Sequence, residues 1–158
     1  MEGTIYKHYK NFKEFYKEAF NIVTNISLKT KELSSVEKIT YIRTVFDSSI
    51  LKSYYSVCNL PNDVKQVLAT NVCELKFSMD NMVKNIIAHP EVLEADYYKI
   101  SSIVNNPSKF YKSKNGYDVI LFKAEEKFYK LVIKTTKNKK ENFIKSLHLL
   151  NKERFYKY

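Results

Sequence analysis

The stretch KFYKSKNGYDVILFK, residues 109–123, decides the expected fold of the second half of the chain. Two runs rich in aromatic and β-branched residues flank Asn115-Gly116, and such runs are typical of strands. Asn-Gly favours a two-residue type I′ turn, in which both central residues take a positive φ angle. The stretch therefore predicts a β-hairpin.

The two-residue period of this hairpin continues to the end of the chain. We expect four strands at about residues 109–113, 117–123, 128–135 and 142–150, joined by the linkers AEEK and KNKKE. Short linkers between strands indicate an antiparallel meander. The sequence thus predicts a four-stranded antiparallel sheet.

Helical periodicity dominates the chain up to about residue 88. Apolar residues recur at steps of three and four over 12–23, as in an amphipathic helix. Ser34 and Glu37 form a capping-box pattern before a second helix, which we expect to end near Asn59 because Pro61 follows. The segment 63–88 predicts one long helix, or two helices that meet at FSMDN.

The helical pattern ends at His89, which precedes Pro90 and is therefore biased away from helix. A shorter helix is expected over about 94–105, before the first strand. Helices first and an antiparallel sheet last give an α+β fold. We expect a helical domain at 1–88, a candidate docking module for a partner, and a basic α+β domain at 89–158.

Composition excludes several classes of protein. Of 158 residues, 44% are hydrophobic, enough for a globular core, but only two are glycines. A glycine-rich phosphate loop, and with it the usual nucleotide-dependent enzymes, is therefore not expected. His8, His89 and His148 lie far apart in the sequence without a carboxylate pair, so we predict no metal site and no cofactor.

The expected location is the cytoplasm of the cell that makes or hosts the protein. Cys58 and Cys73 lie in apolar segments and are expected to be buried free thiols in a reducing compartment. No signal-peptide pattern opens the chain, and no apolar run reaches the roughly 18 residues that a membrane span needs. We expect no membrane partner.

Positive charge is concentrated in the last third of the chain. Residues 109–158 hold 14 Lys and Arg against 5 Asp and Glu, whereas residues 1–108 hold 13 against 12. A localised basic surface is typical of proteins that bind nucleic acid. The alternative is a solvated lysine-rich surface. The residues predicted to contact nucleic acid are Lys123, Lys130, Lys134, Lys137, Lys139, Lys140, Lys145 and Tyr129.

The last expected strand carries a serine and a histidine two residues apart. In ENFIKSLHLL, residues 141–150, alternation places Phe143, Leu147 and Leu149 on the core face and Ser146 and His148 on the opposite face. The pair is either part of a site or a half-exposed surface pair. Imidazole suits proton transfer near neutral pH.

This chemistry suits cleavage of RNA by attack of the 2′-hydroxyl on the adjacent phosphate. That reaction needs an acid, a base and donors for the charged phosphorane, without a cofactor. His148 would transfer a proton, Ser146 would donate to a phosphate oxygen, and a strand lysine such as Lys123, Lys130 or Lys134 would hold the phosphate.

Residues 89–158 resemble the phage-encoded barnase, EndoU, colicin and RelE-like nuclease domains. The resemblance lies in HPEVLEADYYKISSIVNNPSKF, with its early histidine and Asn-Pro stop, and in the antiparallel strands that end in SLHLL. It implies that His89 and Ser146 form the active-site pair, with a strand lysine as phosphate clamp. The arginine often present on the sheet has no counterpart, because Arg43 and Arg154 lie outside the expected strands.

The sequence therefore predicts an RNA-binding protein, and a metal-independent ribonuclease of phage or toxin type is the enzyme hypothesis. The alternative is a non-enzymatic protein of a phage or mobile element that inhibits a host nucleoprotein or defence complex through its basic surface. A toxin would have an acidic antitoxin as its partner.

Overall fold

A computed structural model describes residues 9–27 and 29–158 of the chain. In the first part of the chain three helices come first, and strands and helices then alternate. The strands form one mixed, six-stranded sheet in the order β1 (Tyr54–Asn59), β2 (Glu74–Ser78), β6 (Asn142–Leu150), β5 (Phe128–Thr135), β4 (Asp118–Ala124) and β3 (Lys109–Lys112). The structure confirms an α+β fold, but the sheet has two more strands than the sequence predicts, and one of its pairings is parallel. The described residues include no helix long and apolar enough to cross a membrane.

Two compact units make up the chain. One comprises the described part of Met1–Tyr55 together with Phe77–Pro90, and the other comprises Ser56–Lys76 and Glu91–Tyr158. We call them the helical unit and the sheet unit. The sequence prediction of domains that meet between residues 88 and 89 stays a prediction, because a compact unit is not by itself an independently folding domain.

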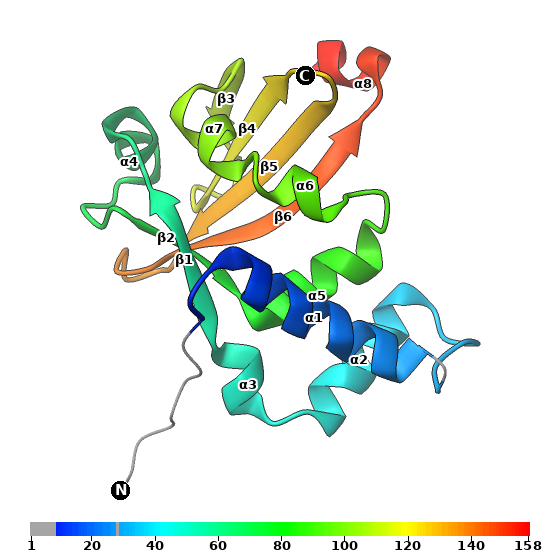
Figure 1. The fold of residues 1–158 in the computed structure, drawn as a ribbon. Helices are drawn as coiled ribbons and strands as arrows, with labels where there is room; N and C mark the ends of the chain where they lie inside the picture. Colours follow the sequence, from blue (N-terminus) through cyan, green and yellow to red (C-terminus); the bar gives the residue numbers. More distant parts are fainter. Residues whose placement is uncertain (1–8, 28) are drawn as a thin grey trace, which may run out of the picture. The chain divides into compact units, whose positions relative to one another are not determined.

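The helical unit contains α1 (Phe12–Ser27), α2 (Ser35–Val45), α3 (Ser48–Lys52) and α5 (Met79–Ala88). Helix α5 contacts the other three helices (Figure 1). The fully buried ring of Phe15 lies 5.9 Å from the ring of Tyr55 and 6.2 Å from that of Phe77. Aromatic contacts therefore build much of the core of this unit.

The capping box predicted at Ser34 is present. The Ser34 hydroxyl accepts a hydrogen bond from the Glu37 backbone at 3.2 Å, and the Glu37 carboxylate accepts one from the Ser34 backbone at 3.1 Å. The helix that follows is shorter than predicted, because α2 ends at Val45 and the chain forms α3 and then strand β1 (Tyr54–Asn59). Aromatic and β-branched residues in YYSVCN favour a strand there.

The segment from 63 to 88 contains two helices, as one of the two predictions has it, but a strand that the apolar spacing does not predict lies between them. Helix α4 (Asn62–Leu68) ends at Ala69, whose φ angle of 55° is left-handed, and strand β2 (Glu74–Ser78) follows. Leu75 and Phe77 are both fully buried, as the two-residue period of a strand requires. Ser78 then caps α5, so FSMDN marks a change from strand to helix.

The sheet unit contains α4, α6 (Glu94–Tyr97), α7 (Ile100–Asn105), β3 (Lys109–Lys112), β4 (Asp118–Ala124), β5 (Phe128–Thr135), β6 (Asn142–Leu150) and α8 (Lys152–Lys157). Strands β3 to β6 form the predicted antiparallel meander. Strand β2 adds parallel to β6, with Leu75 opposite Asn142. The single helix expected at 94–105 is divided into α6 and α7.

The predicted hairpin is present, but its turn differs from type I′. Strands β3 and β4 pair through Lys112 and Val119, and the turn that joins them has a positive φ angle, 81°, at Gly116 but not at Asn115. The side-chain oxygen of Asn115 instead accepts hydrogen bonds from the backbone of Tyr117 and Asp118. Such a local bond is the reason asparagine favours turns.

The meander has one face in the core and one face partly open. Leu121, Leu131, Ile133, Ile144 and Leu147 are fully buried on the inner face, where α7 packs on β4 and β5 (Figure 1). Helix α8 covers part of the opposite, outer face, where buried Phe155 packs near Phe122 and Leu150.

A β-bulge in β6 changes which side chains before it face the core, compared with the prediction. Val132 lies opposite Ser146 and Ile133 lies opposite Ile144, so Lys145 is an extra residue without a partner on β5. Ile144 is therefore fully buried in the core, while Phe143, predicted for the core face, is only half-buried. Beyond the bulge Leu147 points to the core and Ser146 and His148 point outward, as predicted.

Candidate functional site on the outer face of the sheet

Ser146 and His148 contact each other on the outer face. The Ser146 Oγ lies 3.0 Å from His148 Nε2, a hydrogen bond in which the donor depends on the tautomer of the ring. Both residues are half-buried. In the register of the sheet His148 lies opposite Lys130, whose side chain therefore leaves the same face. The structure thus brings a hydroxyl, an imidazole and a strand lysine to one face.

Lys130 is held beside the aromatic ring of Tyr158. Its Nζ lies 4.8 Å from the ring centroid and 3.5 Å from the hydroxyl. A hydrogen bond from Arg154, aided by the charge of Lys130, lowers the pKa of the Tyr158 hydroxyl below its ordinary value. Sequence reasoning missed Tyr158, because no periodic pattern connects a residue after the last strand to the middle of β5.

Apart from Lys130, the lysines predicted to contact nucleic acid fall into two groups of three. The ammonium groups of Lys123, Lys139 and Lys145 have partners within the sheet unit: the carbonyl of Asn106 at 2.6 Å, the carbonyl of Leu68 at 3.1 Å and the carboxylate of Asp118 at 3.0 Å. Within the described residues, the ammonium groups of Lys134, Lys137 and Lys140 have no hydrogen bond or ion pair, and all three side chains are exposed. The lysines available to a phosphate are therefore this second group and Lys130.

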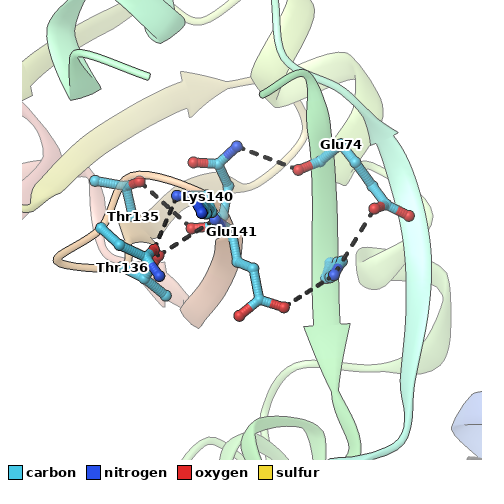
Figure 2. A network of polar contacts seen from close by, with 8 residues as sticks. Glu74, Thr135, Thr136, Lys140 and Glu141 are labelled. Carbon is cyan, nitrogen blue, oxygen red and sulfur yellow. Dashed lines mark hydrogen bonds and ion pairs between the residues drawn. The ribbon is translucent and has the colours of Figure 1, made fainter. Parts of the chain in front are cut away.

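The β5–β6 loop that carries Lys137 and Lys140 is ordered by its own polar groups (Figure 2). The Thr136 hydroxyl donates to the Asn138 side chain at 2.7 Å and accepts from the Glu141 backbone at 3.2 Å. The backbone of Lys140 donates to Asn138 at 3.0 Å. These bonds hold the loop in one shape, so its exposed lysines are presented without a large loss of backbone entropy.

A hollow of about 290 Å³ lies at the end of the sheet where β4 begins and β5 ends. Its lining includes Asn115, Tyr117, Asp118, Lys134, Lys137 and Lys145. Asp118 is 6% exposed, and its Oδ2 accepts hydrogen bonds from both Lys145 and Asn115. Because Lys145 neutralises this carboxylate, the remaining lysines give the hollow a positive surface.

Tyr129, predicted to contact nucleic acid, lies in the core. Its side chain points to the inner face, is 3% exposed, and donates a hydrogen bond to the Asp96 carboxylate at 2.7 Å. Burial and the negative charge of Asp96 raise the pKa of the Tyr129 hydroxyl above its ordinary value. The ring of Tyr129 therefore offers no surface on which a base could stack.

His89 belongs to the helical unit, whereas Ser146 and His148 belong to the sheet unit. It forms the C-cap of α5, where its backbone N–H donates to the carbonyl of Asn85 at 2.8 Å. This agrees with the expected change of structure before Pro90. The role of His89 as a partner of Ser146 stays a prediction.

The two cysteines are free thiols. Cys58 is half-buried, and burial raises the pKa of its thiol to about 11. Cys73 is exposed, contrary to the expectation that both are buried. Among the described residues, no three His, Cys, Asp or Glu side chains lie close enough together to hold a metal ion.

Comparisons of the chain with protein-family models, with curated proteins and with solved structures find no match. The resemblance of residues 89–158 to nuclease domains therefore stays a prediction.

Proposed function

We propose that the protein binds RNA through the outer face of its sheet unit and cleaves it by attack of the 2′-hydroxyl on the adjacent phosphate. The observation that carries this proposal is the hydrogen bond between Ser146 and His148 on a face that also presents Lys130. An imidazole beside a cation suits proton transfer at a phosphate.

Each group has a defined role in the proposed reaction. His148 takes the proton from the 2′-hydroxyl as its oxygen bonds to phosphorus, while Lys130 and the Ser146 hydroxyl stabilise the charge on the nonbridging oxygens. The bond from phosphorus to the 5′ oxygen then breaks, and that oxygen takes a proton from a second donor. In the proposed reaction solvent water supplies this proton. The products are a 2′,3′-cyclic phosphate and a 5′-hydroxyl end.

Incubation of the purified protein with end-labelled RNA in EDTA tests the reaction. We expect products with 2′,3′-cyclic ends, and we expect His148→Ala to reduce the rate at least a hundredfold because proton transfer contributes about 10²–10⁴. His8→Ala is the matched control, since it removes the third histidine of the chain. Equal cleavage by wild-type protein and by His148→Ala would contradict the proposal.

A second candidate function is RNA binding without cleavage, as in an inhibitor of a host nucleoprotein. One observation favours it: the sheet unit contains a single histidine, His148, while the reaction needs both an acid and a base. RNA that is bound with a steep salt dependence but left intact would support this candidate.

A further inference from the structure

Two exposed tyrosines flank the buried Phe122 on the outer face. Tyr111 lies opposite Ile120 in the register of β3 and β4, and its ring centroid is 5.6 Å from that of Phe122 at an interplanar angle of 62°. The ring of Tyr158 is 4.8 Å from Phe122 at 31°. Tyr111 is 40% exposed and Tyr158 is 41% exposed. We call Tyr111, Phe122 and Tyr158 the tyrosine surface.

Tyr158 contacts side chains that rise from the outer face of the sheet. Phe122 and Lys130 are partners on neighbouring strands, so both side chains rise from the sheet on the same face. Tyr158 contacts both of them, the phenyl ring at 4.8 Å and the ammonium at 4.8 Å from its centroid. Tyr158 therefore packs on the outer face of the sheet while 41% of its surface stays exposed to solvent.

The tyrosine surface lies next to cations and to the Ser146–His148 pair. Lys109 Nζ is 5.4 Å from the ring of Phe122 and donates to the backbone carbonyl of Phe155 at 2.8 Å, which fixes α8. Lys130 joins the two features, since it contacts Tyr158 on one side and lies opposite His148 on the other. A nucleotide whose base stacks on Tyr158 would thus have its phosphate close to Lys130.

From this arrangement we propose that the RNA bound by the outer face is single-stranded, with unpaired bases stacked on Tyr158 and Tyr111. The inference rests on the proposed RNA binding and names its substrate class. Single-stranded nucleic acid is commonly held by aromatic side chains on which successive bases stack, next to lysines that follow the backbone. A duplex keeps its bases stacked on one another and offers only phosphates and sugars to such a face.

The test compares single-stranded and fully paired RNA of the same length by fluorescence anisotropy. We expect the wild-type protein to bind the single strand at least tenfold more tightly. Tyr158→Ala and Tyr111→Ala should each weaken that binding about tenfold, because each variant loses the ring on which one base stacks. Tyr158→Phe and Tyr111→Phe keep the ring and should retain most of the affinity.

Tyr98→Ala is the matched control. This tyrosine is 52% exposed and lies at the end of α6, away from the outer face, so its removal should leave the affinity unchanged. The slope of affinity against salt should also stay the same in Tyr158→Ala and Tyr111→Ala, because no phosphate contact is lost. Urea unfolding of each variant shows whether the sheet unit stays folded, and the Phe variants test stacking independently of stability.

The outcomes separate this inference from the proposed function. Equal affinity for single-stranded and paired RNA, or an unchanged affinity in both folded Ala variants, would overturn stacking while RNA binding stands. Absence of binding to either RNA would overturn the proposed function and this inference with it.

Discussion

Asp96 illustrates how one buried residue holds elements of the sheet unit together. Its side chain is 4% exposed and accepts hydrogen bonds from the Leu93 backbone at 2.8 Å, from the Tyr129 hydroxyl at 2.7 Å and from Lys127 at 3.1 Å. One carboxylate thereby caps α6 and fastens it to β5. A buried charge is tolerated when several donors satisfy it, as they do here.

Replacement of Asp96 by alanine should be strongly destabilising. The change leaves the buried Tyr129 hydroxyl without its acceptor and removes the α6 cap, so we expect the free energy of unfolding to fall by about 3 kcal/mol. Lys127→Ala is the control: its side chain is 41% exposed, and we expect a loss of about 1 kcal/mol or less. Urea denaturation measures both, and equal losses would show that the carboxylate has no special role.

The same carboxylate predicts a pH dependence of stability. Burial raises the pKa of Asp96, but the hydrogen bonds from Leu93, Tyr129 and Lys127 outweigh it and hold the pKa below its ordinary value of 3.8. The stabilisation is therefore complete above pH 3.8 and is lost as the pH falls through the lower pKa of the folded state. The difference in urea stability between wild type and Asp96→Asn should be constant from pH 5 to pH 7 and should shrink below pH 3.8. A constant difference at all pH values would contradict this assignment.

For single residues, the alternation of side chains along a strand could be predicted from the sequence, but contacts with distant segments could not. A spacing of two placed Ser146 and His148 on one face, and their hydrogen bond follows from it. The partners of Lys123, Lys139 and Lys145 depend on segments up to 71 residues away in the sequence, so no local pattern could show that these lysines are engaged.

At the scale of the element, strands that pair locally were predictable. The meander from β3 to β6 joins neighbours in sequence through short linkers, and its two-residue period is uninterrupted except at the bulge. Strand β2 pairs in parallel with β6, far along the chain. The apolar residues of β2 continue the spacing of three and four residues found in α4 and α5. The spacing of apolar residues alone therefore favoured a helix in place of β2.

The exposed lysines of the β5–β6 loop and of the end of β5 predict how RNA binding depends on salt. The triple variant Lys134→Ala, Lys137→Ala and Lys140→Ala removes the three exposed lysines that have no ion pair within the described residues. If RNA phosphates contact all three, the slope of log affinity against log salt should become less steep by about 2, since each contact with single-stranded nucleic acid contributes about 0.7.

The matched control removes the same charge from the helical unit, with Lys13, Lys17 and Lys31 replaced by alanine. All three are exposed. A salt slope that changes equally in both triple variants would indicate a general effect of net charge rather than a contact at the β5–β6 loop. Salt titrations of RNA binding by anisotropy distinguish the two results.

At the scale of the whole molecule, the sheet is assembled from segments far apart in the sequence. Asn142, the first residue of β6, is fully buried and its side-chain amide donates to the carbonyls of Val72 at 2.9 Å and Glu74 at 3.3 Å. Lys76 forms an ion pair with Glu141 next to the start of β6 and another with Glu74 on its own strand (Figure 2). Residues that precede helix α5 in the sequence therefore pair with the edge of β6 and satisfy the buried Asn142 amide.

This dependence predicts how fragments of the chain fold. A fragment of residues 89–158, the domain expected from the sequence, lacks β2 and α4, so β6 becomes an unpaired edge and the Asn142 amide loses both acceptors. We expect that fragment to unfold without cooperativity or to aggregate, whereas a fragment of residues 56–158 keeps these partners and should unfold cooperatively. Urea denaturation followed by circular dichroism, with sedimentation to detect aggregates, measures both. A soluble 89–158 fragment with a cooperative transition as stable as that of 56–158 would show that β2 is dispensable, and would support the boundary between residues 88 and 89.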